Sequence, residues 1–166
     1  MRLPYFFVYL NLGITTNNNH LMTITTFDAF SRLSINDISR ISRFLHEHSG
    51  EFTDTKSAIQ KSIMYAAKEV PGLGGYVFIM ENKQEILGAI VVNRTGMNEY
   101  LAENILVYMA VKTEYRGRGI AQKLIEHTIK YCDGDIAIHV NKDNPVIELF
   151  EKQGFKARNI EMRLVR

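Results

Sequence analysis

The sequence predicts one α/β domain built on a mixed sheet, and three observations carry this prediction. From Met22 onward, segments rich in β-branched and aromatic residues alternate with segments whose apolar residues recur at helical spacing. Three of the β-rich segments follow one another with only short turns between them, which is typical of antiparallel strands. After the third, the order becomes strand, turn, helix, strand, and such a unit places its two strands parallel.

A strand and two helices open the domain. "MTITTFDAF" (22–30) indicates the strand, and Ser34 can cap the N-terminus of the first helix. The apolar residues expected on one face of this helix are Ile35, Ile38, Ile41 and Leu45. The second helix is expected from about Asp54 to Lys68, before "PGLGG" (71–75) ends it. Its apolar stripe consists of Ile59, Ile63, Ala66 and Ala67.

The three consecutive strands come next. "YVFIME" (76–81) and "EILGAIVVN" (85–93) are split by Asn82 and Lys83, which favours a hairpin. "ENILVYMAV", from Glu103 to Val111, is the third strand of the series.

The remainder supplies the parallel unit and the end of the domain. A glycine-rich turn leads into a helix with apolar spacing at Ala121, Leu124, Ile125, Thr128 and Ile129. A strand is expected from Asp135 to Asn141, parallel to the preceding strand. A last helix, with Val146, Leu149 and Phe150 on one face, ends at Gly154 and precedes a closing strand near "IEMRLV" (160–165).

Length and composition fit a single domain. The chain has 166 residues, of which 46% are hydrophobic and 23% charged, as in ordinary globular proteins. The apolar run "LPYFFVYLNLGI" (3–14) resembles the core of a secretory signal but is too short to span a membrane. Polar residues, "TTNNNH" (15–20), follow it in place of a small-residue cleavage site. We therefore expect residues 1–21 to be an extension, residues 22–166 to be the domain, and no membrane partner.

Charge and cysteine content exclude several classes of protein. A net charge of +2 with no clustered basic stripe argues against nucleic acid as a partner. Cys132 is the single cysteine, so the chain has no internal disulfide, and no Cys/His spacing suggests a metal site. These features favour a cytoplasmic protein without a metal.

The turn "EYRGRGIAQKL" (114–124) predicts an anion site. Backbone N–H groups and the positive end of the following helix dipole point to one spot at such a turn, where phosphate binds. Gly117 and Gly119 allow a ligand close to the backbone, and Arg116 and Arg118 add positive charge at the rim.

Two well-known phosphate binders do not match this turn. A P-loop needs Gly-Lys-Ser/Thr at the helix start, where this chain has Ile120 and Ala121 after the glycine. A dinucleotide fold needs a third glycine where Gln122 stands.

Two segments resemble the GNAT superfamily of N-acetyltransferases. Arg116-x-x-Gly119-x-Ala121 matches its R/Q-x-x-G-x-G/A turn within "VYMAVKTEYRGRGIAQKL" (107–124), and "NPVIELFEKQGFK" (144–156) is similar to its last-helix signature. The resemblance covers about 75–166 and implies the GNAT fold, with splayed parallel strands and helices on both faces. It also implies acetyl-CoA as co-substrate, with its pyrophosphate held by the turn. The residues implied to hold it there are Arg116, Gly117, Arg118, Gly119, Ile120, Ala121 and Gln122.

The same resemblance assigns the strand before the turn to the thioester and the pantetheine arm. The backbone N–H of Met109 is the implied oxyanion donor, and the backbone of Met109, Ala110 and Val111 lies along the pantetheine. Asn144 lies where the cofactor of the family passes, although a capping or turn role is open for it.

The usual acid and base of the family are missing from this chain. Phe150 stands where many members have a tyrosine that protonates the thiolate, and Ile105 stands where some have a glutamate. Glu103, Tyr108 and His139 are the nearest replacements, and His139 alone has an ordinary pKa near neutrality. Catalysis by positioning, with water removing the proton, is the alternative. We interpret Cys132 as a packed thiol rather than a nucleophile.

We therefore expect an N-acetyltransferase in which a primary amine attacks acetyl-CoA directly in a ternary complex. A non-catalytic acyl-CoA-binding or regulatory domain is the alternative, since Phe150 and Ile105 replace the usual catalysts. The acceptor stays open among small-molecule and protein amines, because the two early helices and "RTGMNEYLAEN" (94–104) shape its groove. Either a monomer or a homodimer is compatible with the sequence.

Deletion of residues 1–21 tests the domain boundary. We expect the shortened chain to keep its thermal midpoint and its affinity for acetyl-CoA, because the first strand begins only after Met22. Thermal unfolding and calorimetry on both lengths measure the two quantities. A large loss of stability on deletion would place part of 1–21 within the domain.

Overall fold

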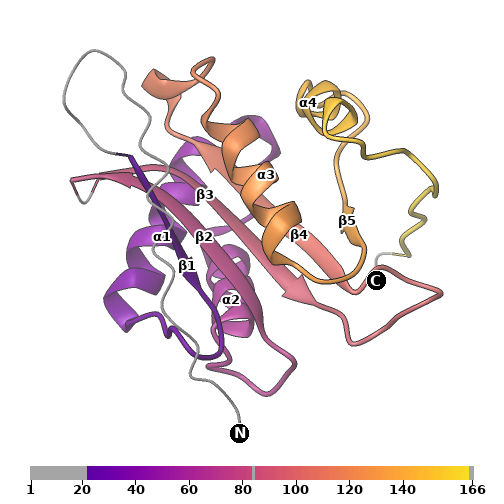
Figure 1. Cartoon of the computed structure of the whole chain (residues 1–166), viewed down its shortest axis with the longest axis horizontal. Helices are drawn as coiled ribbons and strands as arrows, with labels where there is room; N and C mark the ends of the chain where they lie inside the picture. The colour runs from indigo at the N-terminus through magenta and orange to yellow at the C-terminus, as the bar shows by residue number, and fades with distance from the viewer. Residues whose placement is uncertain (1–21, 84, 165–166) are drawn as a thin grey trace, which may run out of the picture.

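The computed structural model describes residues 22–83 and 85–164, which form a five-stranded sheet with helices on both faces (Figure 1). The strands, in order across the sheet, are β1 (Thr23–Phe27), β2 (Gly75–Asn82), β3 (Glu85–Arg94), β4 (Asn104–Val111) and β5 (Ile136–Ile138). The helices are α1 (Ile35–His48), α2 (Lys56–Ala66), α3 (Ile120–Tyr131) and α4 (Val146–Lys152), with short 3-10 turns η1 (Gly50–Phe52) and η2 (Thr113–Tyr115). Strands β1 to β4 pair antiparallel and β4 pairs with β5 in parallel, which confirms the predicted mixed sheet.

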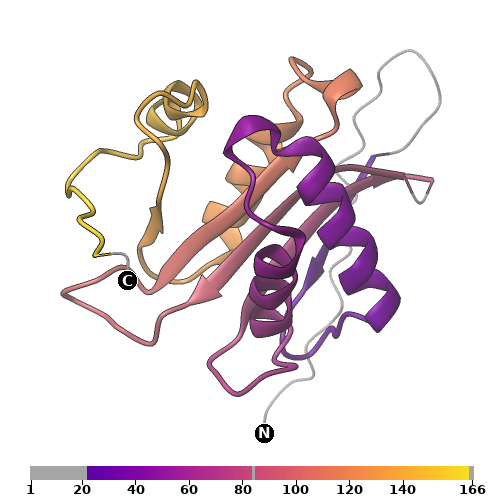
Figure 2. The same cartoon turned by 180° about the vertical axis from the view of Figure 1, so that it is seen from behind.

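Two apolar cores lie on opposite faces of this sheet. Figure 2 shows α1 and α2 against one face, and Figure 1 shows α3 across the other. Alternate residues of β2 enter the two cores: Val77 and Ile79 pack with α1 and α2, whereas Phe78 and Met80 pack on the α3 side. Strands β2 and β3 are covered by helices on both faces. One edge of β4 therefore pairs with a buried strand, β3.

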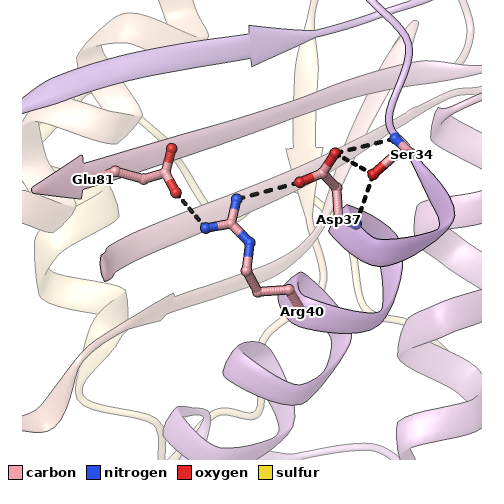
Figure 3. A network of polar contacts seen from close by, with 4 residues as sticks. All are labelled: Ser34, Asp37, Arg40 and Glu81. Carbon is pink, nitrogen blue, oxygen red and sulfur yellow. Dashed lines mark hydrogen bonds and ion pairs between the residues drawn. The ribbon is translucent and has the colours of Figure 1, made fainter. Parts of the chain in front are cut away.

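The start of α1 is fixed by a capping box (Figure 3). Ser34 Oγ accepts the backbone N–H of Asp37 at 3.1 Å, and Asp37 Oδ2 accepts the backbone N–H of Ser34 at 3.1 Å. The Ser34 hydroxyl also donates to Asp37 Oδ2 at 2.6 Å, and this bond makes the largest contribution to lowering the pKa of Asp37, followed by the bond from the Ser34 backbone N–H and by Arg40. Arg40 also donates to Glu81 Oε1 at 2.6 Å, so the capped helix is tied to β2. The sequence prediction of Ser34 as the cap is confirmed.

Two residues predicted in the apolar stripes are exposed instead. Ile35 is 86% exposed because it occupies the first position of α1, one turn before Ile38, and this first turn stands clear of the core. Ile129 is 41% exposed, since the buried stripe of α3 runs through Ile120, Leu124, Ile125 and Thr128 and leaves it at the rim.

The C-terminal part differs most from the prediction. β5 covers Ile136–Ile138 rather than 135–141, because its pairing with β4 ends there. The closing strand expected near 160–165 is absent from the described residues 160–164, which pair with no strand. Ile160 and Met162 are 91% and 92% exposed. The alternating pattern is that of a strand, but no strand edge binds it, and backbone pairing is what makes a strand.

His127 of α3 joins this helix to β1. Its Nε2 lies 3.0 Å from Thr26 Oγ1, and its ring stacks on Tyr131 and meets Phe78 edge-on. Burial, with a smaller contribution from the charge of Lys130, lowers the pKa of His127. The folded structure therefore favours the neutral imidazole.

We expect His127 to make the fold sensitive to acid. A histidine with a lowered folded-state pKa binds its proton more readily in the unfolded chain, so stability rises with pH over this range. The contribution is present above the unfolded pKa of about 6.5 and is lost as the pH falls from there through the folded-state value. Urea unfolding at several pH values should show a weaker acid dependence in His127→Gln than in the wild type. The same acid dependence in both chains would contradict this role.

Candidate active site

β4 and β5 are paired over only part of β4. The parallel pairs are Asn104 with Ile136, Ile105 with Ala137 and Leu106 with Ile138, whereas β4 continues to Val111. Beyond β5 the chain turns toward α4, away from β4 (Figure 1). The second half of β4 therefore has an open edge among the described residues, and a cleft of about 2850 Å³ lies along it. Both strands, the start of α3, α4 and residues 156–161 line this cleft.

A β-bulge at Val107 determines which backbone groups face the cleft. Tyr108 pairs with Val91 of β3 and Leu106 with Val92, so Val107 is one extra residue between them. Before the bulge, the N–H of Asn104 is directed to β5, where it binds Asp135 O at 3.1 Å.

After the bulge, the direction of alternate residues is reversed. The N–H of Lys112 binds Leu87 O on the β3 side at 2.8 Å, so the odd-numbered residues before it point the other way. Met109 and Val111 accordingly direct their N–H and C=O groups at the open edge. Arg116 Nε lies 3.4 Å from Val111 O, in agreement with this orientation. Ala110 also lines the cleft, but its backbone groups are directed at β3.

The glycine-rich turn ends at an uncapped helix. Gly117 and Gly119 have φ of 73° and 76°, which non-glycine residues rarely adopt. Gly119 is the N-cap of α3, and within the described residues no side chain caps this end. Lys123 makes the first hydrogen bond of the helix, to Gly119 O, so the N–H groups of the preceding first turn, at Ile120, Ala121 and Gln122, are left for a ligand. A Cβ at Gly117 or Gly119 would meet open space.

The arginines of the turn have different contacts. Arg116 Nη2 donates to His48 O at the end of α1 at 2.6 Å, so this arginine ties the turn to α1 rather than standing free at the rim. The guanidinium carbon of Arg118 lies 4.9 Å from the centre of the Tyr115 ring, and Lys112 Nζ lies 5.9 Å from it. Arg118 and Lys112 therefore share the Tyr115 ring, and Lys112 is also ion-paired with Glu85.

Gly88 of β3 sets how closely α3 approaches the sheet, which the sequence analysis did not anticipate. A Cβ at this position would lie 2.7 Å from Leu124 Cδ1 and 2.9 Å from Ile120 Cγ2. Both residues belong to the first half of α3, so the small residue fixes the depth of the turn relative to β4.

The predicted acid and base candidates are not brought together. Glu103 Oε2 accepts the backbone N–H of Asp135 at 2.7 Å, which holds the start of β5, and Glu103 is not among the residues that line the cleft. His139 lines the cleft but is exposed, beyond the end of β5. Ile105 also lines it and supplies no titratable group.

Tyr108 is bound to a partner that the sequence analysis missed. Its Oη donates to Asp54 Oδ2 at 2.7 Å, and both residues line the cleft. Burial, followed by this bond and the charge of Asp54, raises the pKa of Tyr108. Asp54 and Tyr108 are far apart in sequence, and no local pattern relates them.

The remaining candidates lie on α4 and at the end of α3. Phe150 is 3% exposed, with its ring centre 5.2 Å from that of Phe155, and it lines the cleft. Asn144 Oδ1 accepts the N–H of Val146 at 3.0 Å, which is a turn role at the start of α4. Burial raises the pKa of the Cys132 thiol to about 12, with a smaller contribution from Asp133, which agrees with a packed thiol.

Within the described ranges, no helix combines the length and apolar character that crossing a membrane requires. In the same part of the chain, histidine, cysteine and carboxylate side chains form no group that could hold a metal ion.

Comparison with known proteins identifies the family. The profile described as the acetyltransferase (GNAT) domain matches residues 74–157, which is half of the chain. The chain therefore belongs to the GNAT acetyltransferase family. Members of this family use acetyl-CoA.

Two solved structures are similar to this chain in fold, and one other protein is similar to a short stretch of its sequence. A possible acetyltransferase from Clostridium difficile 630 has a TM-score of 0.62 at 17% identity, over 87% of this chain and 97% of that one. An aminoglycoside N-acetyltransferase solved in complex with CoA has a TM-score of 0.60 at 16% identity, over 92% and 99%. The cysteine-rich protein 2-binding protein of Mus musculus is 40% identical over 55 residues, 32% of this chain. That match covers 7% of the length of the mouse protein.

Proposed function

We propose that this chain transfers the acetyl group of acetyl-CoA to a primary amine, by direct attack within a ternary complex. The observation that carries the proposal is the meeting of two features at one cleft: the open edge of β4 and the uncapped N-terminus of α3. The first suits an extended amide-bearing arm, and the second suits a phosphate.

The cofactor would lie across these two features. The pyrophosphate binds the N–H groups of the first turn of α3, next to Gly117 and Gly119, where open space surrounds the backbone. Arg118 contributes positive charge, and Arg116 keeps the turn against α1. The pantetheine pairs with the outward-directed groups of Val111, as an added strand would. Phe150 contributes an apolar wall, and Asn144 shapes the turn before α4.

In this proposal, the Met109 N–H binds the thioester oxygen. The neutral amine nitrogen forms a bond to the carbonyl carbon, and the negative charge that develops on the oxygen is stabilised by this donor. The C–S bond then breaks, the thiolate leaves, and one nitrogen proton passes through water to the sulfur. The products are the N-acetyl amine and CoA with a free thiol.

Side-chain acid–base groups have a minor part in this proposal. Glu103 holds β5, and Tyr108 keeps its proton in the hydrogen bond to Asp54. His139 is exposed just beyond the end of β5. Positioning and backbone electrostatics therefore carry the reaction, with water as the proton carrier.

Thiol release over a panel of amines tests the proposed function. Wild-type chain with acetyl-CoA should release thiol when a suitable primary amine is present and not without it. The alternative, a non-catalytic acyl-CoA-binding domain, rests on Phe150 and Ile105. Tight binding of acetyl-CoA without amine-dependent thiol release would favour that alternative.

Substitution of Gly119 tests the phosphate site. Gly119→Asp places a carboxylate beside the free N–H groups of α3, so we expect calorimetry to show loss of acetyl-CoA binding. Gly119→Asn is the matched control, because asparagine has a similar size, tolerates positive φ and carries no charge. A folded Gly119→Asp chain that binds as well as Gly119→Asn would contradict the placement of the pyrophosphate.

Phe150→Tyr tests whether a proton donor is missing. The ring lines the cleft, so the added hydroxyl should reach it, and we expect normal cofactor binding with an unchanged or higher turnover rate. A gain of about tenfold corresponds to about 1.4 kcal/mol and would show that proton donation limits the wild type. Loss of folding or of cofactor binding would show that Phe150 is sealed in the core and does not face the sulfur.

A further inference from the structure

Asp54 and Tyr108 form a polar pair on the opposite face of the sheet from the turn. Tyr108 packs against the core of α1 and α2, whereas the turn and α3 belong to the other core. The β-bulge at Val107 puts Tyr108 on this face, because it places the consecutive side chains of Val107 and Tyr108 on the same side of the sheet. Tyr108 immediately precedes Met109 in β4. The pair therefore flanks the proposed acetyl position from the face that the cofactor does not occupy.

The chain holds Asp54 in place at two points. Its backbone carbonyl oxygen lies 3.2 Å from His46 Nδ1 of α1, and its Oδ2 accepts the Tyr108 hydroxyl. Its second carboxylate oxygen makes no hydrogen bond within the described residues, and no cation there forms an ion pair with Asp54. The side chain is exposed to the cleft. An oriented carboxylate with an available oxygen is suited to binding an ammonium group.

Tyr108 serves this arrangement as a donor. Because burial and Asp54 raise its pKa, the hydroxyl keeps its proton near neutral pH and cannot take one from the amine. Its contribution is to fix the direction of the carboxylate.

We propose that Asp54, oriented by Tyr108, binds the ammonium form of the acceptor and thereby selects a cationic amine. This inference rests on the proposed function, because it requires the acetyl group of acetyl-CoA to lie at the Met109 N–H. The amine approaches from the α1 and α2 face and the cofactor from the α3 face, and they meet between the diverging strands. The ammonium group releases one proton to water before the neutral nitrogen attacks. Asp54 is a specificity residue, and Tyr108 is a positioning residue.

Steady-state kinetics with acceptors of different charge test the selection. Asp54→Asn should raise the KM for primary alkylamines and alkyl diamines about tenfold or more, as expected when a charge-assisted hydrogen bond is lost. The kcat should change little. For hydroxylamine and arylamines, which are uncharged near neutral pH, the same substitution should leave the KM unchanged. An equal rise for charged and uncharged acceptors would overturn the proposal.

Glu51→Gln is the matched control for general electrostatics. Glu51 lines the same cleft and lies on the same connection between α1 and α2, but it has no bond to Tyr108. Its substitution should change the KM for alkyl diamines far less than Asp54→Asn does. Equal effects would show that overall charge, and not the oriented carboxylate, attracts the amine.

Tyr108→Phe separates orientation from charge. It should raise the KM for alkyl diamines by a smaller factor than Asp54→Asn, and it should add little in the double variant, because both act through one carboxylate. Full additivity would contradict the coupling. The affinity for CoA and the thermal midpoint of each variant should match the wild type, which shows that the fold is intact.

Calorimetry distinguishes failure of this inference from failure of the proposed function. An alkyl diamine titrated into the complex with CoA, which carries no acetyl group, reports the amine site without turnover. Tighter binding to the wild type than to Asp54→Asn supports the site even where thiol release is absent. Equal binding, or no binding to a wild type that holds CoA, overturns it.

Discussion

The extra residue at Val107 is the constraint on which the cleft depends. A strand has two edges, and regular alternation would direct the N–H of Met109 at β3, where it would be consumed in the ladder. One inserted residue reverses the alternation for the rest of β4, so the donors of Met109 and Val111 face outward. The pairing of β4 with β5 ends at Leu106, the residue just before the insertion. The free donors and the space in front of them therefore begin at the same point of β4.

The segment between α1 and α2 connects the two sides of the cleft. At its start, His48 O accepts Arg116 of the turn, and further along Asp54 accepts Tyr108 of β4. Each bond joins this segment to a part of the chain more than fifty residues away. Since both sites rest on the same connection, the distance between the proposed phosphate position and the proposed amine position is set by one piece of backbone. The first arginine of the turn is thus explained by structure rather than by phosphate charge.

The sequence was informative where local patterns decide the outcome. The Ser34 cap, the hairpin at Asn82 and the glycine turn before α3 depend on neighbouring residues, and each was predicted. The bulge and the bond between Asp54 and Tyr108 depend on register across strands and on contacts over long separations, which periodicity does not encode. The expected strand near 160–165 shows that a local pattern typical of a strand does not always form one. Its alternation is correct for a strand, but Ile160 and Met162 pair with no strand, and pattern alone does not supply a partner.

The absence of the usual acid and base side chains is consistent with how the free energy of catalysis is divided. General acid or base catalysis contributes about 10²- to 10⁴-fold, whereas holding two reactants in the correct geometry contributes roughly 7–11 kcal/mol. A single oxyanion donor adds about 2.7–4 kcal/mol. Under the proposed function, the largest contribution comes from the backbone, because the edge of β4 aligns the thioester, and Met109 adds the oxyanion donor. Phenylalanine at 150 and isoleucine at 105 remove the acid–base contribution, which is smaller than that of positioning, and a thiolate leaves without much assistance. In this proposal, Asp54 determines which amine is bound, and water rather than a side chain moves the proton.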